Sequence, residues 1–331
     1  TAYDDKGNVV TDAPFSYSFS GESFDKSSTA AGLIKDDGRF VAETAGKYLI
    51  TVTAGEKSIS KPLVVYDRGI QREVITVGTG TVQDKHTSDF WVFEGQDGND
   101  YAVSGTWGAD GTTYFWDVTD PGNLKKIDSV QVDARTVNDV KVSADGKISI
   151  ISREGASNRR NGIVILDTTN PYNVKILSEY TTNLTGGVHN LYISEDHVYA
   201  LSNGERFYVI NIEDPTNPYE VGMFEIGEKG QAIHDVWIED GIAYSSNWKH
   251  GVYMIDVGNG VAGGSPSNPV AMANYSYESG AHHATFPFKS KSTDKFYTVL
   301  GDEIFPQGID VYTTNETAGF IHFVDFTDIN N

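Results

Sequence analysis

The 331-residue chain contains no cysteine, which excludes disulfide bonds, thiolate nucleophiles and cysteine-ligated zinc sites. Basic residues are also scarce, because 25 lysines and arginines oppose 46 aspartates and glutamates, giving a net charge of −21. Nucleic acids and anionic lipids bind clustered positive charge, so this balance argues against both as partners. No apolar run reaches the roughly 18 residues that span a bilayer, so we expect no membrane insertion in this segment.

Helical periodicity is almost absent, whereas residues typical of strands and turns are plentiful. The chain has 18 tyrosines, 16 phenylalanines and 34 glycines. Apolar and polar residues alternate over short runs that end at Asp-Gly turns, which indicates antiparallel strands. The chain begins at Thr1 rather than Met and is strongly acidic, so we expect a mature or trimmed piece of an extracellular or cell-surface protein.

One phrase recurs in the later part of the chain: an apolar run, then Asp or Asn, then a turn with proline. Two copies are residues 163–171 (IVILDTTNP) and 207–215 (FYVINIEDP). The equivalent positions in all copies are Asp117, Asp167, Asn211, Asp256 and Asp325. Each of these side chains is expected to accept a hydrogen bond from a backbone N–H group of the following turn.

A second phrase, which starts with a polar pair and continues into a strand, precedes each copy of the first. The five copies begin at Ser88, Asn138, His189, His234 and His283. Each repeat thus offers about four short strands, and a lone four-stranded sheet cannot bury both of its faces. Stacking such sheets around an axis does bury them, so the sequence predicts an all-β protein with a β-propeller over residues 70–331.

Five blades fit the repeat best, and six or seven are possible if the native chain continues past residue 331. The last copy stops before its outermost strand. Residues 71–77 precede the first copy and have the pattern of such a strand. We therefore expect residues 71–77 to complete the last blade and close the ring.

Residues 1–67 do not share the repeat. Short alternating runs at 15–19, 46–52 and 62–66 are separated by Asp/Gly turns. Strands at this spacing predict a small immunoglobulin-like β-sandwich, which displays or links the propeller.

The repeat resembles that of the LVIVD-repeat family of bacterial and archaeal surface propellers. The similarity rests on residues 163–171 and 207–218, and on the phrases His-Asn-Leu at 189–191 and His-Asp-Val at 234–236. It covers roughly residues 70–331 and implies an exported propeller, often fused to immunoglobulin-like or anchoring segments. It implies no settled chemistry. This sequence departs from the family pattern at Asn211, where Asp is expected, and in its first two repeats, which lack the histidine.

The histidines that start three of the repeats are the strongest candidates for chemistry. Equivalent positions of successive blades converge on the central channel, where neutral imidazoles bind Zn²⁺ or a similar transition metal. The candidate ligands are His189, His234 and His283, with His282, His86, Asp302 and Glu303 nearby in sequence. The alternative is structural: these side chains hydrogen-bond to neighbouring backbone groups and connect the blades.

Two acidic turns, at residues 4–8 and 97–100, are candidate calcium sites, although plain hairpin turns explain them too.

The first functional interpretation is a secreted or cell-surface binding or structural protein. Its partners would be a surface protein, a glycan or further copies of itself. The alternative is a metal-dependent enzyme with its site in the channel.

Overall fold

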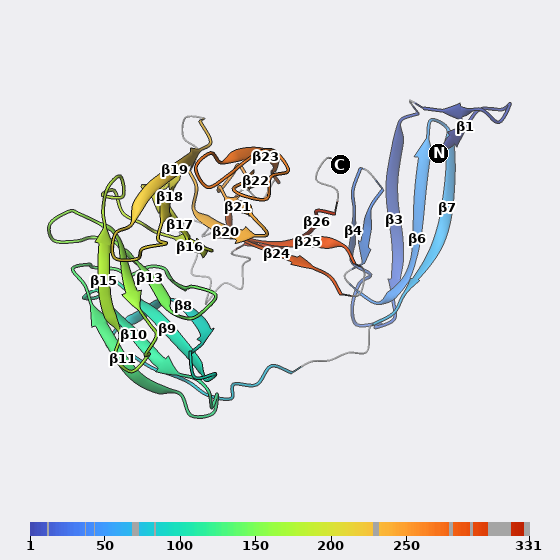
Figure 1. Ribbon diagram of the computed structural model, residues 1–331. Coiled ribbons are helices and arrows are strands. Elements are labelled where there is room, and N and C mark those ends of the chain that lie inside the picture. The colour runs from blue at the N-terminus through green and yellow to red at the C-terminus, as the bar shows by residue number, and fades with distance from the viewer. Residues whose placement is uncertain are drawn as a thin grey trace. The chain divides into compact units, whose positions relative to one another are not determined.

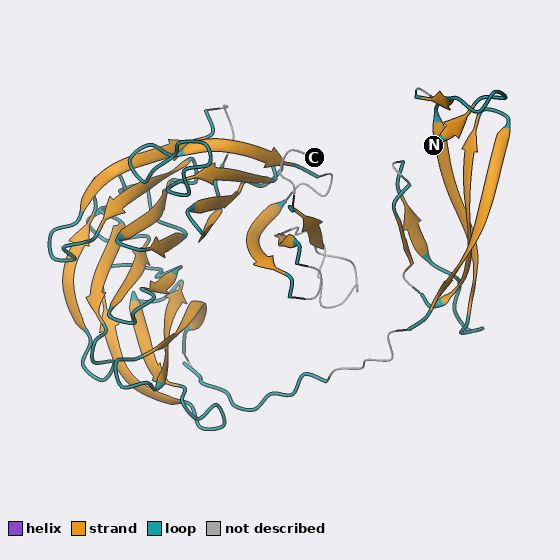
Figure 2. Cartoon of the chain, turned by 45° about the vertical axis from the view of Figure 1, so that its right-hand side comes forward, coloured by secondary structure: helices purple, strands orange, loops and turns teal. Residues whose placement is uncertain are grey.

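A computed structural model of the protein describes residues 1–11, 13–36, 38–42, 44–67, 73–82, 84–227, 232–277, 281–291, 294–303 and 319–327. These residues form strands, turns and loops, and none of them forms a helix (Figure 2). The expected all-β class is therefore confirmed. Across the same residues, no helix has the length and apolar character needed to cross a membrane. The chain divides into two compact units, Thr1–Ile75 and Thr76–Asn331.

The first unit consists of small antiparallel sheets (Figure 1). Two are hairpins, β1 (Ala2–Tyr3) with β2 (Val9–Val10) and β4 (Gly32–Ile34) with β5 (Phe40–Ala42). The third has the order β3-β6-β7, from β3 (Phe15–Ser23), β6 (Gly46–Ala54) and β7 (Lys57–Val65). The rings of Phe19 and Phe40 are half-buried and pack with the buried ring of Tyr48, with centroids 5.1–6.1 Å apart. An immunoglobulin-like arrangement of these strands stays a prediction.

The second unit contains four sheets of four strands, each formed by strands consecutive in sequence. Sheet 1 comprises β8 (His86–Glu94), β9 (Asp100–Trp107), β10 (Thr112–Asp117) and β11 (Lys125–Gln131). Sheet 2 comprises β12 (Val140–Val142), β13 (Ile148–Arg153), β14 (Gly162–Asp167) and β15 (Lys175–Tyr180). Sheet 3 comprises β16 (Leu191–Ser194), β17 (His197–Ser202), β18 (Arg206–Asn211) and β19 (Tyr219–Glu225). Sheet 4 comprises β20 (Asp235–Glu239), β21 (Ile242–Ser246), β22 (Val252–Asp256) and β23 (Val270–Tyr275).

A fifth sheet has three strands, β24 (His282–Lys289), β25 (Phe296–Asp302) and β26 (Ile321–Asp325). Within the described part of the chain, β26 pairs only with β25. Residues 73–77 are described and lie in no strand, and residues 71 and 72 fall outside the described residues. The structure therefore does not show the expected pairing of 71–77 with β26, and closure of the ring by this segment stays a prediction.

The third strand of each sheet carries the recurring apolar run, and β14 shows why that run is almost continuous. Val164 and Leu166 belong to a core shared with sheet 1, whereas Ile163 and Ile165 belong to a core shared with sheet 3. Successive side chains of a strand point to opposite faces, so a strand packed on both faces is apolar at every position. Each such side chain stabilises the fold by about 1.5–3 kcal/mol.

The recurring Asp or Asn at the end of the third strand binds the turn that follows. Its side-chain oxygen accepts a hydrogen bond from the N–H group two residues later in all five sheets, over 2.9–3.1 Å. The expected turn function of Asp117, Asp167, Asn211, Asp256 and Asp325 is confirmed. Asp256 makes more hydrogen bonds than the other four residues. Its carboxylate accepts the N–H groups of Gly258, Gly260, Ala262 and Gly264.

The first strands of consecutive sheets contact one another in series. β8 contacts β12, β12 contacts β16, β16 contacts β20, and β20 contacts β24. Figure 2 shows the sheets of this unit following one another along an arc. The residues that begin the five repeats lie in these first strands or just before them. The contacts between the strands therefore place these residues around one space.

Candidate functional site

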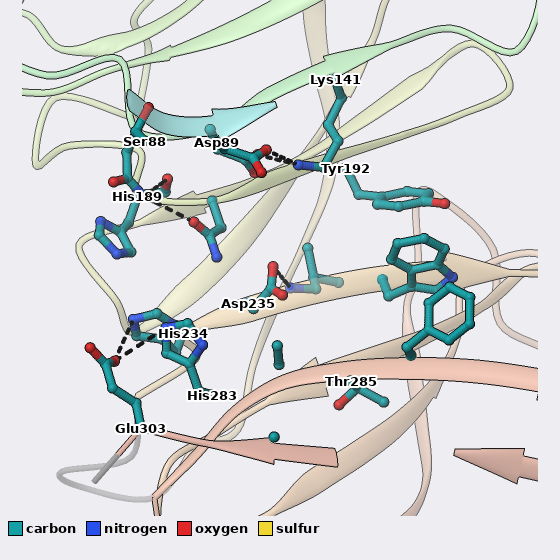
Figure 3. Close-up of a pocket in the computed structure, with 18 of the residues that line it drawn as sticks. Ser88, Asp89, Lys141, His189, Tyr192, His234, Asp235, His283, Thr285 and Glu303 are labelled. Carbon is teal, nitrogen blue, oxygen red and sulfur yellow. Dashed lines mark hydrogen bonds and ion pairs between the residues drawn. The ribbon is translucent and has the colours of Figure 1, made fainter. Parts of the chain in front are cut away.

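A cavity of about 840 Å³ lies between the first strands of the five sheets. Three equivalent residues from every repeat line it, and they form three layers (Figure 3). The histidine layer is Ser88, Asn138, His189, His234 and His283. The carboxylate layer is Asp89, Asp139, Asn190, Asp235 and Ala284. The aromatic layer is Trp91, Lys141, Tyr192, Trp237 and Phe286. The carboxylate and aromatic layers are two residues apart in sequence, which places both on the same face of each strand.

Two members of the histidine layer that are not histidines connect neighbouring sheets. The Ser88 hydroxyl donates to the carbonyl oxygen of Val137 over 2.5 Å, and the Asn138 amide donates to that of His189 over 3.0 Å. The equivalent histidines have different surroundings. The rings of His189 and His234 lie 4.9 Å apart, and those of His234 and His283 lie 4.2 Å apart. The three histidines therefore converge on one another.

His234, His283 and Glu303 form a group able to hold a metal ion, since one ligand atom from each lies within 4.8 Å of the others. Glu303 Oε2 lies 3.2 Å from His283 Nε2 and 3.9 Å from His234 Nε2. The two imidazoles come from neighbouring sheets, and Glu303 directly follows β25 of the sheet that contains His283. Two imidazoles and one carboxylate are a donor set that Zn²⁺ prefers.

The environment of His234 favours the neutral imidazole that a metal requires. Burial, with a smaller contribution from the neighbouring histidines, lowers the pKa of His234 to about 3. Its Nε2 atom faces Glu303 and is the candidate metal ligand. Its Nδ1 atom is buried and has no hydrogen-bond partner among the described residues, so it is a different nitrogen from the one that would bind the ion.

His189 borders this group but is held by a different carboxylate. Its Nδ1 atom lies 2.8 Å from Glu154 Oε1. His189 also lines a second cavity of about 320 Å³, together with Glu154 and Arg135. The pairing with Glu154 gave no signal in the sequence, because Glu154 lies at the end of a different strand and outside the repeated phrases.

His282 and Asp302 lie in a separate, buried network behind the cluster. The Tyr277 hydroxyl lies 2.9 Å from His282 Nδ1 and donates to Asp302 Oδ1 over 2.8 Å. His282 Nε2 lies 2.7 Å from the hydroxyl of Thr285. Burial is the main reason that the pKa of His282 falls to about 4. Adjacent strand residues point to opposite faces, which separates His282 from His283 and Asp302 from Glu303.

The remaining predicted ligands are apart from the cluster. His86 is exposed, with its ring 6.4 Å from that of Trp107. In the candidate calcium turns, Asp4 accepts the N–H groups of Lys6 and Asn8, and Asp97 accepts that of Asn99. These bonds are those of ordinary turns, and calcium binding there stays a prediction.

The side chain of Lys141, a member of the aromatic layer, reaches two members of the carboxylate layer. Its Nζ atom lies 2.8 Å from Asp89 Oδ2, forms a close ion pair with Asp139, and sits 5.2 Å from the ring centroid of Trp91. Burial raises the pKa of Asp139 well above its usual range, and the charge of Asp89 adds to the effect, whereas the Lys141 ammonium opposes it. Both carboxylates also bind the next sheet, since Asp89 accepts the N–H of Val140 and Asp139 that of Leu191.

The aromatic layer brings together rings from four sheets. The ring of Trp91 lies 6.1 Å from those of Tyr192 and Trp237, and Trp237 lies 5.0 Å from both Tyr192 and Phe286. Sheet 1 therefore meets the non-adjacent sheets 3 and 4 at this depth. The cavity has imidazoles and a carboxylate at one level, carboxyl groups around one ammonium at the next, and apolar rings at the third.

Comparison of the chain with models of known protein families and with curated protein sequences gives no match.

Proposed function

We propose that the five sheets are the blades of a β-propeller, and that its central cavity binds a divalent transition-metal ion through His234, His283 and Glu303. The convergence of these three side chains is the observation that carries the proposal. The propeller is supported by the contacts between successive first strands and by the three-layered lining. The resemblance of the repeat to the LVIVD family also implies a propeller.

Exposed apolar side chains on the two terminal sheets support closure of the ring. In sheet 1, Phe90 is 64% exposed and Val92 is 51% exposed. In sheet 5, Ile321 is 70% exposed and Phe323 is 72% exposed. Direct packing between these sheets, or an added strand, buries such surface as the inner sheets already do.

A metal held by two histidines and one carboxylate keeps a coordination position open. The cavity beside the cluster gives a ligand access to that position. We therefore infer a binding module for a ligand that reaches the metal from the cavity. The acidic composition of the chain fits a secreted or cell-surface protein. The ligand of such a protein would be part of a surface protein or a glycan.

The first unit supports display or self-assembly. β7 is an edge strand, since it pairs only with β6 in the part of the chain that the structure describes. An open edge accepts a strand from another chain, so a surface assembly is consistent with this unit. Size measurement by light scattering tests it: a mass that rises with protein concentration supports assembly, and a constant monomer mass contradicts it.

A second candidate function is metal-dependent hydrolysis, and the three-ligand set is the observation that favours it. Zinc bound in this way lowers the pKa of a coordinated water and supplies hydroxide at neutral pH. Turnover that requires the metal and disappears in the His283→Ala variant would establish this candidate.

Calorimetric titration with Zn²⁺ tests the metal site. We expect one ion per chain, and a loss of affinity of at least tenfold in His234→Ala, His283→Ala and Glu303→Gln. His86→Ala is the matched control, because this imidazole is exposed and apart from the cluster. Equal zinc binding by the control and the three variants, or no binding by the native protein, would refute the proposal.

A further inference from the structure

The cavity already contains one ammonium group, that of Lys141, and the groups around it show how the lining holds a cation. Two carboxyl groups, Asp89 and Asp139, lie beside the Nζ atom, and the ring of Trp91 lies 5.2 Å away. Carboxylates supply charge compensation, and the electron-rich face of an aromatic ring adds a cation–π attraction. The carboxylate and aromatic layers together therefore form an ammonium-binding environment.

The same positions recur in sheet 4 without an internal cation. Asp235 corresponds to Asp139 in the carboxylate layer, and Trp237 takes the place of Lys141 in the aromatic layer. Tyr192 of the preceding sheet corresponds to Trp91. The carboxylate of Asp235 accepts the N–H group of Val236 over 2.8 Å. Across the described ranges, no lysine or arginine lies within ion-pair distance of Asp235, although the charge of Lys141 acts on it from further away.

Three rings lie next to one another in this part of the aromatic layer. The centroid of Trp237 lies 5.0 Å from those of Tyr192 and Phe286, with interplanar angles of 51° and 73°. Tilted and edge-to-face rings at these distances pack against one another, and all three residues line the cavity. Figure 3 shows Asp235 between Tyr192 and the histidine cluster.

We propose that the cavity binds an organic cation, with an alkylammonium head held by the carboxylate of Asp235 and the rings of Tyr192, Trp237 and Phe286. The bound head takes the place in sheet 4 that the Lys141 ammonium has in sheet 2. The cavity of about 840 Å³ has room for such a head and for an attached apolar or polar body. This site does not depend on the metal, since none of its four residues is a proposed metal ligand.

An uncharged sugar is the main competing ligand, because pyranose rings also stack on aromatic side chains. A neutral ligand, however, gains neither the cation–π attraction of the rings nor the attraction of the acidic side chains that line the cavity. The net charge of −21 also favours attraction of a cation over a neutral molecule.

Choline and its neutral isostere 3,3-dimethylbutan-1-ol are the probes that separate charge from shape. Both are titrated into the full chain in the presence of a chelator, with tryptophan fluorescence and calorimetry as readouts. We expect choline to bind at least tenfold more tightly than the alcohol. Asp235→Asn and Trp237→Leu should each weaken choline binding by at least tenfold, whereas Asp214→Asn, on an exposed turn, should leave it unchanged.

The His283→Ala variant separates this proposal from the metal site, since it should lose zinc affinity and keep choline binding. Equal affinity for choline and the alcohol, preference for a sugar over both, or no loss in a folded Asp235→Asn protein would overturn the proposal. If Asp235→Asn fails to fold, Trp237→Leu decides, because a folded Trp237→Leu protein that binds choline normally excludes the proposed site.

Discussion

His282 is expected to make the protein sensitive to mild acid, because its imidazole is fully buried as the neutral form. The pKa of a histidine in an unfolded chain is about 6.5, whereas burial lowers that of His282 to about 4. As the pH falls, the unfolded state therefore binds the proton first. Above about pH 6.5 this residue does not lower the free energy of unfolding. As the pH falls from 6.5 toward 4, the free energy of unfolding decreases because the unfolded state binds the proton more tightly.

Linkage gives the size of this effect. Between pH 7 and pH 5, a histidine with these two pKa values reduces the free energy of unfolding by about 2 kcal/mol. Urea denaturation of the native protein and of His282→Asn at both pH values measures it, with chelator present so that metal does not contribute. The variant should be less stable at pH 7 and should lose about 2 kcal/mol less than the native protein on going to pH 5. His86→Asn, an exposed control, should behave as the native protein. An identical acid response in the native protein and His282→Asn would refute the reasoning.

Three further changes test other parts of the structure. Asp256→Ala removes the acceptor of four backbone N–H groups, and it should cost about 3 kcal/mol of unfolding free energy in urea denaturation, whereas no loss would contradict the turn function. Lys141→Met leaves two carboxyl groups without their cation and should destabilise by about 3–5 kcal/mol, and adding Asp139→Asn should restore part of that loss. Tyr277→Phe removes the hydroxyl between His282 and Asp302 and should cost about 1–3 kcal/mol of unfolding free energy in urea denaturation, while zinc affinity stays unchanged because this network is separate from the metal ligands. Loss of zinc affinity in the folded variant would contradict that separation.

Much of the strand pattern could be predicted because it depends on local periodicity. The apolar run at 163–167 is buried on both faces, and the Asp or Asn after each run binds its own turn over two residues. Both features depend only on residues that are close in sequence, so both can be predicted from the sequence alone. Closure of the ring is different, because it depends on contacts between the first and last sheets and on residues outside the described part.

The part of the candidate site that could be predicted is the part formed by equivalent residues of neighbouring repeats, because such residues lie side by side. His234 and His283 occupy the same position in neighbouring repeats, and they do lie together. Strand alternation, which was also visible in the sequence, separates His282 from His283. The partners Glu154 and Tyr277 could not be found in this way, because they lie outside the repeated phrases and reach the histidines only through the three-dimensional arrangement of the sheets.

The convergence of His234, His283 and Glu303 on one metal ion is tested most directly by a crystal structure of the zinc-loaded protein, with anomalous diffraction recorded at the zinc edge. We expect one strong anomalous peak inside the cavity, about 2.1 Å from a nitrogen of each histidine and from a Glu303 oxygen. A cavity with no peak, or histidines that point to separate surfaces, would contradict the account.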